Sequence, residues 1–341
     1  MRTVTLKLVL ILSLIPVTLL GQVSTKTGTT AASFLEIPVG SAAKGMGGAF
    51  VSLANDVSAL YWNAGGIANL TKTEFLAERT GWIAETNIDF VGLVIPVDEV
   101  GVFGVSMTTL SMDDMKVTTV EKQEGTGEFF SAGSMAIGVT FARAVTDRFS
   151  IGFTGKYIEE KIYHMSSYGF ALDAGTYFRT DLFNGMVIGA SFSNFGSQMK
   201  LSGRDSRYFI RVDDTKTGTT DQIPVNIDLD IWDLPFTFQI GVSTNLVKNE
   251  DYRLTTAIDA IHPNNNSESM NVGTEAVYQE SIFIRAGFKS LFMQDREGGL
   301  SFGFGLQTKS LFEKMNVKID YAYRDFDRLG STNGFSIAVQ F

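Results

Sequence analysis

The stretch Phe335-Ser336-Ile337-Ala338-Val339-Gln340-Phe341 alternates apolar residues with small or polar ones. Successive side chains of a β-strand point to opposite faces, so this stretch would have one apolar and one polar face. The apolar face can contact hydrocarbon, the polar face can line a wet interior, and the aromatic end fits a membrane interface. We therefore expect residues 333–341 to be the last strand of an outer-membrane β-barrel. Pairing with the first strand would remove the open edge of the sheet.

The same period-two alternation recurs along the chain from Thr71 onward. In 299–308, for example, large apolar residues alternate with serine, glycine and glutamine. Most such segments are near the roughly 9–11 residues that a tilted strand needs to cross a bilayer. The expected strands are about 14 segments: 72–82, 85–96, 100–110, 132–144, 148–160, 168–179, 185–195, 235–247, 252–262, 270–279, 281–290, 299–308, 314–325 and 333–341.

The connections between these segments alternate in length. Short polar turns, such as 96–99 and 145–147, alternate with longer loops, such as 111–131 and 196–234. Outer-membrane barrels have short periplasmic turns and longer external loops. A secreted β-sandwich or propeller, the alternative fold, has no reason to alternate its loops in this way. The pattern predicts an all-β transmembrane antiparallel barrel with both termini on the periplasmic side.

Composition excludes several other classes of protein. The 341 residues carry a formal net charge of −9, which argues against nucleic-acid binding. No segment after the N-terminus reaches the roughly 20 apolar residues of a transmembrane helix. Cysteine is absent, so disulfides, thiolate metal sites, a cysteine nucleophile and a lipid-anchored cysteine are excluded.

The N-terminus has the form of a secretory signal peptide. Positive charges at Arg2 and Lys7 precede an apolar stretch over 8–20, which Gly21-Gln22 follows. We expect residues 1–21 to be removed on export; the alternative is a buried N-terminal helix. The expected location is the bacterial outer membrane.

Residues 31–70 do not alternate and are rich in glycine, alanine and serine. The segment 85–96 is apolar on both faces, which implies an apolar object inside the barrel. We expect residues 22–70 to be an N-terminal hatch in the lumen and residues 71–341 to be the barrel. Lys318 and Asp320 lie two apart on one strand face, so they are expected to join a lumenal charge network.

Two runs in the predicted hatch resemble a known family signature. They are GSAAKGMGGAF over 40–50 and NDVSALYWNAGGIA over 55–68. Together they resemble the N-terminal signature of the PorV/PorQ family, outer-membrane proteins related to FadL-type fatty-acid channels. The match departs at Ala64, where the family usually has proline. The resemblance implies a FadL-like barrel with a lumenal hatch whose motif residues are Gly45, Gly47, Trp62, Asn63 and Gly65.

The resemblance also implies function. In the FadL branch, the hatch and a kink in the wall guide hydrophobic substrates sideways out of the barrel. In the PorV branch, the barrel works with the type IX secretion machinery and receives exported proteins with a C-terminal sorting domain. The main hypothesis is therefore docking of secretion-machine proteins or cargo for secretion and surface attachment. A FadL-type channel for hydrophobic small molecules is the alternative, and a structural barrel in lipid without a substrate is a third.

The longest loop holds the expected partner-binding residues, the aromatics Tyr208, Phe209, Trp232 and Phe236. Exposed aromatics on a loop often mark a partner surface, although an aromatic girdle at the outer interface is an alternative. The loop also carries carboxylates at positions 213, 214, 221, 228, 230 and 233. We interpret them as a solvated acidic loop rather than a divalent-cation site.

No pattern in the sequence predicts catalysis or a cofactor. The glycines at 45–48 lack the spacing and the preceding strand of a nucleotide-binding loop. His164 and His262 have no partners at metal-ligand spacing, and both are expected to be solvated. There is no Gly-x-Ser-x-Gly elbow. We expect no enzyme activity, no catalytic or metal site and no cofactor.

Overall fold

The computed structural model describes residues 26–211, 223–293, 296, 298–311 and 315–341. They form one antiparallel sheet of 15 strands, of which β10 (Ser202–Gly203) has only two residues and pairs with β8 alone. The other 14 make the wall. These are β1 (Glu74–Gly81), β2 (Asn87–Val97), β3 (Gly101–Ser111), β6 (Ala132–Ala144), β7 (Phe149–Ile162), β8 (Met165–Arg179), β9 (Val187–Gly196), β13 (Thr237–Lys248), β14 (Tyr252–Pro263), β15 (Ser269–Tyr278), β16 (Ile282–Leu291), β17 (Leu300–Leu311), β18 (Met315–Asp325) and β19 (Ser331–Gln340).

The sheet closes on itself. β1 pairs with its neighbour β2 and also with β19, where Phe75 lies opposite Val339 and Ala77 opposite Ile337. Closure satisfies the backbone groups of both edges, which a strand in lipid requires. The predicted closed antiparallel barrel of 14 strands is thus confirmed, with the strand ends shifted by a few residues.

The outer face of the barrel is an apolar belt. On β17, Leu300, Phe302, Phe304 and Leu306 are exposed, whereas Ser301 between them is fully buried. β2 shows the same alternation with an apolar inner face, where Ile88, Phe90 and Val94 are almost fully buried. An exposed belt of this extent belongs in lipid, so the barrel lies in an outer membrane. Among the described residues, none of the helices has the length and apolar character needed to span a bilayer.

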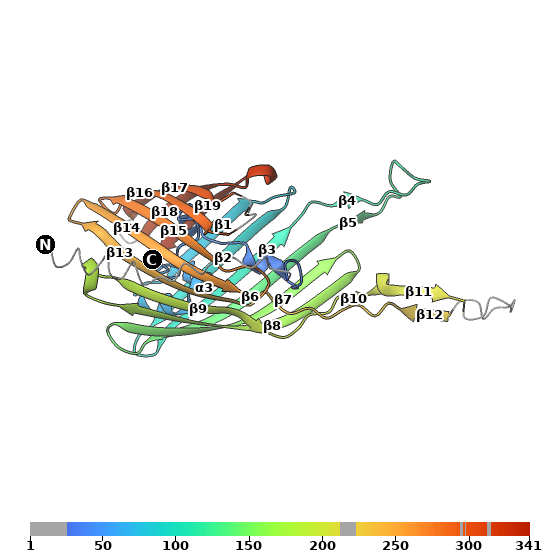
Figure 1. The fold of residues 1–341 in the computed structure, drawn as a ribbon, viewed down its shortest axis with the longest axis horizontal. Helices are drawn as coiled ribbons and strands as arrows, with labels where there is room; N and C mark the ends of the chain where they lie inside the picture. The colour runs from blue at the N-terminus through green and yellow to red at the C-terminus, as the bar shows by residue number, and fades with distance from the viewer. Residues whose placement is uncertain (1–25, 212–222, 294–295, 297, 312–314) are drawn as a thin grey trace.

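Long connections leave the barrel at one end. The β3–β6 connection contains the hairpin of β4 (Met115–Lys116) and β5 (Phe129–Phe130). The β9–β13 connection contains η4 (Arg204–Ser206) and the hairpin of β11 (Arg207–Ile210) and β12 (Ile223–Asn226). Both hairpins project from the same end (Figure 1). We call this the outer end, because external loops are the long ones in such barrels.

Short helices occupy the lumen. They are η1 (Ser33–Glu36), α2 (Ser41–Gly45), α3 (Ala59–Trp62) and η2 (Ala64–Asn69), and most residues of 32–70 are buried. α2 contacts β16 to β19, whereas η2 contacts β3 and β6 to β8. These strands lie on different sides of the ring, so the segment spans the lumen (Figure 1). We call residues 31–70 the hatch segment.

The hatch segment runs from the outer end to the inner end. Ala31 N donates to the Asp233 carbonyl, just before β13 starts at the outer end. At the other end of the segment, η2 ends at Asn69 and the chain enters β1 at the inner end. Two further helical turns, η3 (Leu182–Asn184) and η5 (Asp327–Leu329), lie in connections of the wall. The predicted signal peptide over 1–21 falls outside the described residues and stays a prediction.

Candidate functional site

Glycines let the wall and the hatch segment touch backbone to backbone. A Cβ on Gly175 of β8 would lie 2.7 Å from Ala64 N, and one on Gly152 of β7 would lie 2.8 Å from Gly65 N. Real Cβ atoms do not approach that closely, so only glycine fits at these positions. The inward glycines of the wall therefore form a seat for the hatch segment.

The motif glycines of the hatch segment face this seat. A Cβ on Gly45 would lie 2.8 Å from Gly303 Cα, and one on Gly65 would lie 2.8 Å from the Gly175 carbonyl oxygen. Gly47 has φ +68°, and its Cβ would lie 2.6 Å from Phe288 N. Gly47 is thus required both for its backbone conformation and for its close approach to β16.

Asn63 ties the hatch segment to itself and to the wall. Its side chain accepts from Gly65 N at 3.1 Å and donates to the carbonyls of Val51 at 2.9 Å and Thr176 at 2.8 Å. Trp62 lies beside it, and its Nε1 donates to the Val39 carbonyl at 2.8 Å. Buried backbone groups need such partners, so both residues hold an irregular segment inside the barrel.

Carboxylates on the wall anchor the hatch segment. Glu78 of β1 accepts from Lys44 Nζ at 2.7 Å, and the two side chains are only 1% and 5% exposed. Glu78 also accepts from Gly40 N and from Ser41 Oγ. Asp259 of β14 accepts from the backbone N–H groups of residues 50 and 51 at 2.7 and 2.9 Å. These anchors were not singled out from the sequence, because an inward carboxylate looks like any other lumen-lining polar residue.

Near the outer end, Glu160 of β7 accepts from Ala32 N at 3.0 Å, and Glu36 of η1 accepts from Asn265 Nδ2 at 3.1 Å. Burial raises the pKa of the Glu36 carboxyl, and the hydrogen bond from Asn265 partly offsets that effect. The hatch segment is therefore held along its whole length, from Ala32 to Gly65.

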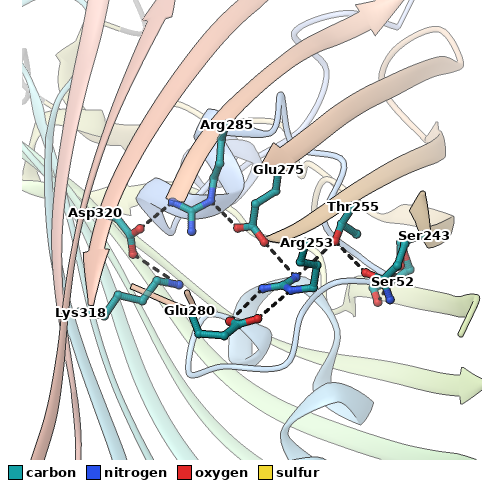
Figure 2. A network of polar contacts seen from close by, with 10 residues as sticks. Ser52, Ser243, Arg253, Thr255, Glu275, Glu280, Arg285, Lys318 and Asp320 are labelled. Atoms are coloured by element: carbon teal, nitrogen blue, oxygen red, sulfur yellow. Dashed lines mark hydrogen bonds and ion pairs between the residues drawn. The ribbon is translucent and has the colours of Figure 1, made fainter. Parts of the chain in front are cut away.

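A network of ion pairs joins side chains near the inner ends of β14, β15, β16 and β18 (Figure 2). Arg285 of β16 is fully buried and bonds Glu275 at 2.7 Å and Asp320 at 2.6 Å. Lys318 lies 3.7 Å from Asp320, so these two residues share a lumenal network as expected. Arg253 extends the network from Glu275 to Glu280. The three cations and the three carboxylates of the network balance in formal charge.

A polar cavity of about 160 Å³ lies between the hatch segment and the wall. The hatch segment lines it with Leu35, Glu36, Pro38, Tyr61 and Trp62. The wall contributes amide, hydroxyl and lysine side chains together with a few apolar ones. The wall residues are Lys156, Ser193, Asn194, Thr237, Gln239, Ile261, Pro263, Asn266, Ser267, Ser269, Asn271, Lys289, Ser290 and Met293, which include the outer loops. We call this the lumenal cavity.

An apolar groove of about 540 Å³ lies in the wall at β6 to β9. Exposed residues of the outer belt line it, and no atom lies within 4 Å of a Cβ placed on Gly155. We call it the wall groove. Its lining residues are Ile137, Val139, Gly155, Lys156, Tyr157, Phe170, Ala171, Leu172, Phe195, Gly196 and Ser197.

Lys156 borders both the lumenal cavity and the wall groove. Its Nζ pairs with Asp173 at 2.6 Å and donates to Asn194 Oδ1 at 2.9 Å. The β8–β9 register shifts between Leu172 and Ala174, and Asn194 has φ +63°. Such a bulge interrupts the ladder. The ladder of the wall is thus irregular near Lys156, the residue that borders both spaces.

The predicted partner-binding aromatics do not form one surface. Tyr208 and Phe209 are 53% and 61% exposed on β11, away from the wall. Trp232 exchanges backbone hydrogen bonds with Met199 near the outer end of the wall. Phe236 stacks on Phe192 of β9 at 5.9 Å between ring centroids. The first pair suits an external contact, whereas Phe236 belongs to the aromatic outer face.

The remaining polar candidates have local partners. Asp228 pairs with Lys200 at 2.5 Å, which lowers the pKa of the Asp228 carboxyl. Asp233 accepts from Gln198 Nε2. His164 contacts Asp205, and His262 contacts Glu268. In the described part of the chain, no group of three or more metal-ligating side chains lies together. The acidic positions 213, 214 and 221 fall outside the described residues.

Comparison with known proteins identifies the fold. Residues 18–155 match an uncharacterised protein family, UPF0164. Among curated proteins, none matches this chain. A Pseudomonas aeruginosa FadL homologue shares 12% identity, with 89% of this chain and 98% of that chain covered and a TM-score of 0.51. The toluene transporters TbuX of Ralstonia pickettii and TodX of P. putida share 11%, each with 89% and 97% covered, at TM-scores of 0.53 and 0.54.

At these identities the likeness establishes the fold alone. The chain is an outer-membrane barrel of the FadL-like fold. The resemblance of residues 40–68 to the PorV/PorQ signature stays a prediction.

Proposed function

We propose that this protein is an outer-membrane channel for small hydrophobic molecules. The proposal rests on one observation. The lumenal cavity and the wall groove approach each other at Lys156, which lines both of them. Two solved relatives in fold, TbuX and TodX, are toluene transporters, which supports the same class of solute.

The proposed path leads from the lumenal cavity through the wall. The anchored hatch segment spans the lumen, and the charge network around Arg285 lies below it, so we expect the axial path to be obstructed. An apolar solute gains free energy by leaving water for hydrocarbon, so the wall groove would release it into the bilayer. The hatch segment would stay in place throughout.

Filling the wall groove is expected to slow uptake. The substitution Gly155→Trp places a large side chain in the groove, where a Cβ meets no other atom. Uptake of labelled toluene by Gram-negative cells that produce the variant should fall several-fold. Gly81→Trp is the matched control, because Gly81 is also exposed with open space around it but lies on β1. Equal uptake by the Gly155→Trp variant and the control would contradict the proposed path.

The external hairpins support a second candidate, docking of exported proteins for type IX secretion and surface attachment. Tyr208 and Phe209 are exposed on the β11–β12 hairpin, which projects beyond the barrel (Figure 1). Exposed aromatics of this kind are enriched at protein interfaces. Secretion-machine subunits or cargo with a C-terminal sorting domain would be the partners.

The double variant Tyr208→Ser/Phe209→Ser tests this second candidate. Cross-linked partners recovered from native outer membranes should lose their secretion-machine subunits and sorting-domain cargo. Leu182→Ser/Phe183→Ser is the control, since these residues are equally exposed but lie in η3 at the inner end. Unchanged recovery of those partners with the hairpin variant would argue against docking there.

A further inference from the structure

The outer end of β9 borders both the lumenal cavity and the wall groove. Ser193 and Asn194 line the lumenal cavity, and the next residues along the chain, 195–197, line the wall groove. The ladder between β9 and β13 ends where Ser193 lies opposite Thr237. Beyond that point, the described ladder of β9 continues on its β8 side alone. We call residues 194–197 the β9 tip.

A β-bulge interrupts the seam between β8 and β9 at the base of this tip. Residues 193 and 194 of β9 together face Asp173 of β8, because the register shifts between Leu172 and Ala174. A bulge of this kind leaves backbone groups without a ladder partner. The Asn194 N–H donates instead to the Asp173 carboxylate at 2.8 Å. A side chain thus replaces backbone pairing at this point of the wall.

Lys156 joins this contact from the next strand, β7. Its Nζ lies 2.6 Å from the Asp173 carboxylate and 2.9 Å from Asn194 Oδ1. The Asn194 amide in turn donates to the Pro235 carbonyl at 3.1 Å, just before β13. The Lys156 and Asp173 side chains are only 9% and 7% exposed, so water weakens their charge-assisted hydrogen bonds little. One buried ion pair therefore ties β7, β8 and β9 together beside the bulge.

We propose that Lys156, Asp173 and Asn194 form a latch that holds the β9 tip against β8, and that its release opens the wall between the lumenal cavity and the wall groove. The inference rests on the proposed function, because it names the place where a solute would leave the barrel. Side chains can rotate away from one another, whereas ladder bonds join backbone groups that must stay paired in lipid. Lys156 and Asn194 line the polar lumenal cavity, so their released groups would stay out of hydrocarbon.

Hydrogen exchange of the full-length protein in a non-ionic detergent tests the latch without any transport. The amide of Ser197, which donates to the Phe170 carbonyl at 2.9 Å, reports separation of the β9 tip from β8. Asp173→Ala removes the acceptor of Asn194 N and the partner of Lys156. Exchange in peptides from the β9 tip should then be about tenfold faster or more, as loss of a charge-assisted hydrogen bond implies. Asp173→Asn keeps an acceptor and should give a smaller increase.

Lys318→Gln is the control for these exchange measurements. Lys318 also lies beside a lumenal carboxylate, but it belongs to β18, so exchange at β8 and β9 should match the wild type. Unchanged exchange of the β9 tip in Asp173→Ala would overturn the proposal, as would equal acceleration in every wall strand. If Asp173→Ala does not fold, Lys156→Gln takes its place under the same criteria.

A disulfide across the seam tests whether solutes use this opening. The chain has no cysteine, so Leu172→Cys/Phe195→Cys introduces a single pair, at facing positions of β8 and β9. Oxidation of this pair should lower the uptake of labelled toluene several-fold, and reduction should restore it. Tyr157→Cys/Phe170→Cys is the matched control, since these facing residues line the same groove but join β7 to β8. Its oxidation should leave uptake unchanged.

Equal uptake by the oxidised and reduced forms of the β8–β9 pair, with normal uptake by the wild type, would overturn the latch as the opening of the path. Absence of toluene uptake by the wild type would contradict the proposed function instead. Hydrogen exchange would then decide the latch alone, because it does not depend on transport.

Discussion

Replacement of Glu78 by alanine is expected to release residues 40–44 of the hatch segment from the wall. Lys44 would remain buried with its partner gone, and Gly40 N and Ser41 Oγ would lose their acceptor. Breaking a buried ion pair from one side typically costs about 3–5 kcal/mol. Because the hatch segment obstructs the lumen, its release should raise the ion conductance of the barrel in planar bilayers well above that of the wild type.

Asp89→Ala provides the control for Glu78→Ala. Asp89 lies 3.7 Å from Arg79, but these side chains are 35% and 68% exposed on the outer face. An exposed pair contributes little, so stability and conductance should match the wild type. Background conductance in the Glu78→Ala variant would show that this anchor does not hold the hatch segment.

The second large effect is expected from Gly175→Ala, which adds a single methyl group to the glycine seat of the wall. A Cβ on Gly175 would lie 2.7 Å from Ala64 N and 3.0 Å from Gly65 N, both backbone atoms that cannot move separately from η2. Overpacking of this kind costs about 1–3 kcal/mol. Loss of the Asn63 hydrogen bond to the Thr176 carbonyl would add to it. Gly175→Ala should therefore lower the urea concentration at the midpoint of unfolding. Unfolding is measured from the mobility of unboiled protein on gels.

Gly155→Ala is the matched control for this substitution. Gly155 lies on the adjacent strand β7 but faces lipid, where a Cβ meets no atom within 4 Å. A nearly unchanged midpoint is expected there. Equal destabilisation by the two alanines would mean that strand propensity, rather than contact with the hatch segment, determines the need for glycine.

The sequence predicts the barrel well because lipid imposes a simple rule on every wall strand. One face must be apolar along its whole length, so alternation such as that of Leu300, Phe302, Phe304 and Leu306 is visible without any structure. The apolar inner face of β2 is equally informative about the interior of the barrel. Phe90 and Val94 pack in one core cluster with Val57 and Leu60 of the hatch segment. An object inside the barrel was therefore predictable from a strand that is apolar on both sides.

The anchors of the hatch segment, the lumenal cavity and the wall groove could not be predicted from the sequence. Asp259 binds backbone N–H groups, which every residue has, so no sequence pattern marks its partners. Gly152 and Gly155 face opposite sides of β7, as alternation predicts, but alternation does not predict that one touches the hatch segment and the other borders the wall groove. The sequence groups the predicted partner-binding aromatics in one loop, whereas the structure separates Tyr208 on the hairpin from Phe236 on the wall.

The central claim is a lumen that stays sealed to ions while hydrophobic solutes pass through the wall. The most direct test pairs two readouts of the wild-type protein. These are uptake of labelled toluene by Gram-negative cells that produce it and ion conductance of the purified protein in planar bilayers. The account predicts faster uptake than in cells without the protein, together with background conductance. Steady conductance of an open pore, or uptake no faster than in cells without the protein, would contradict it.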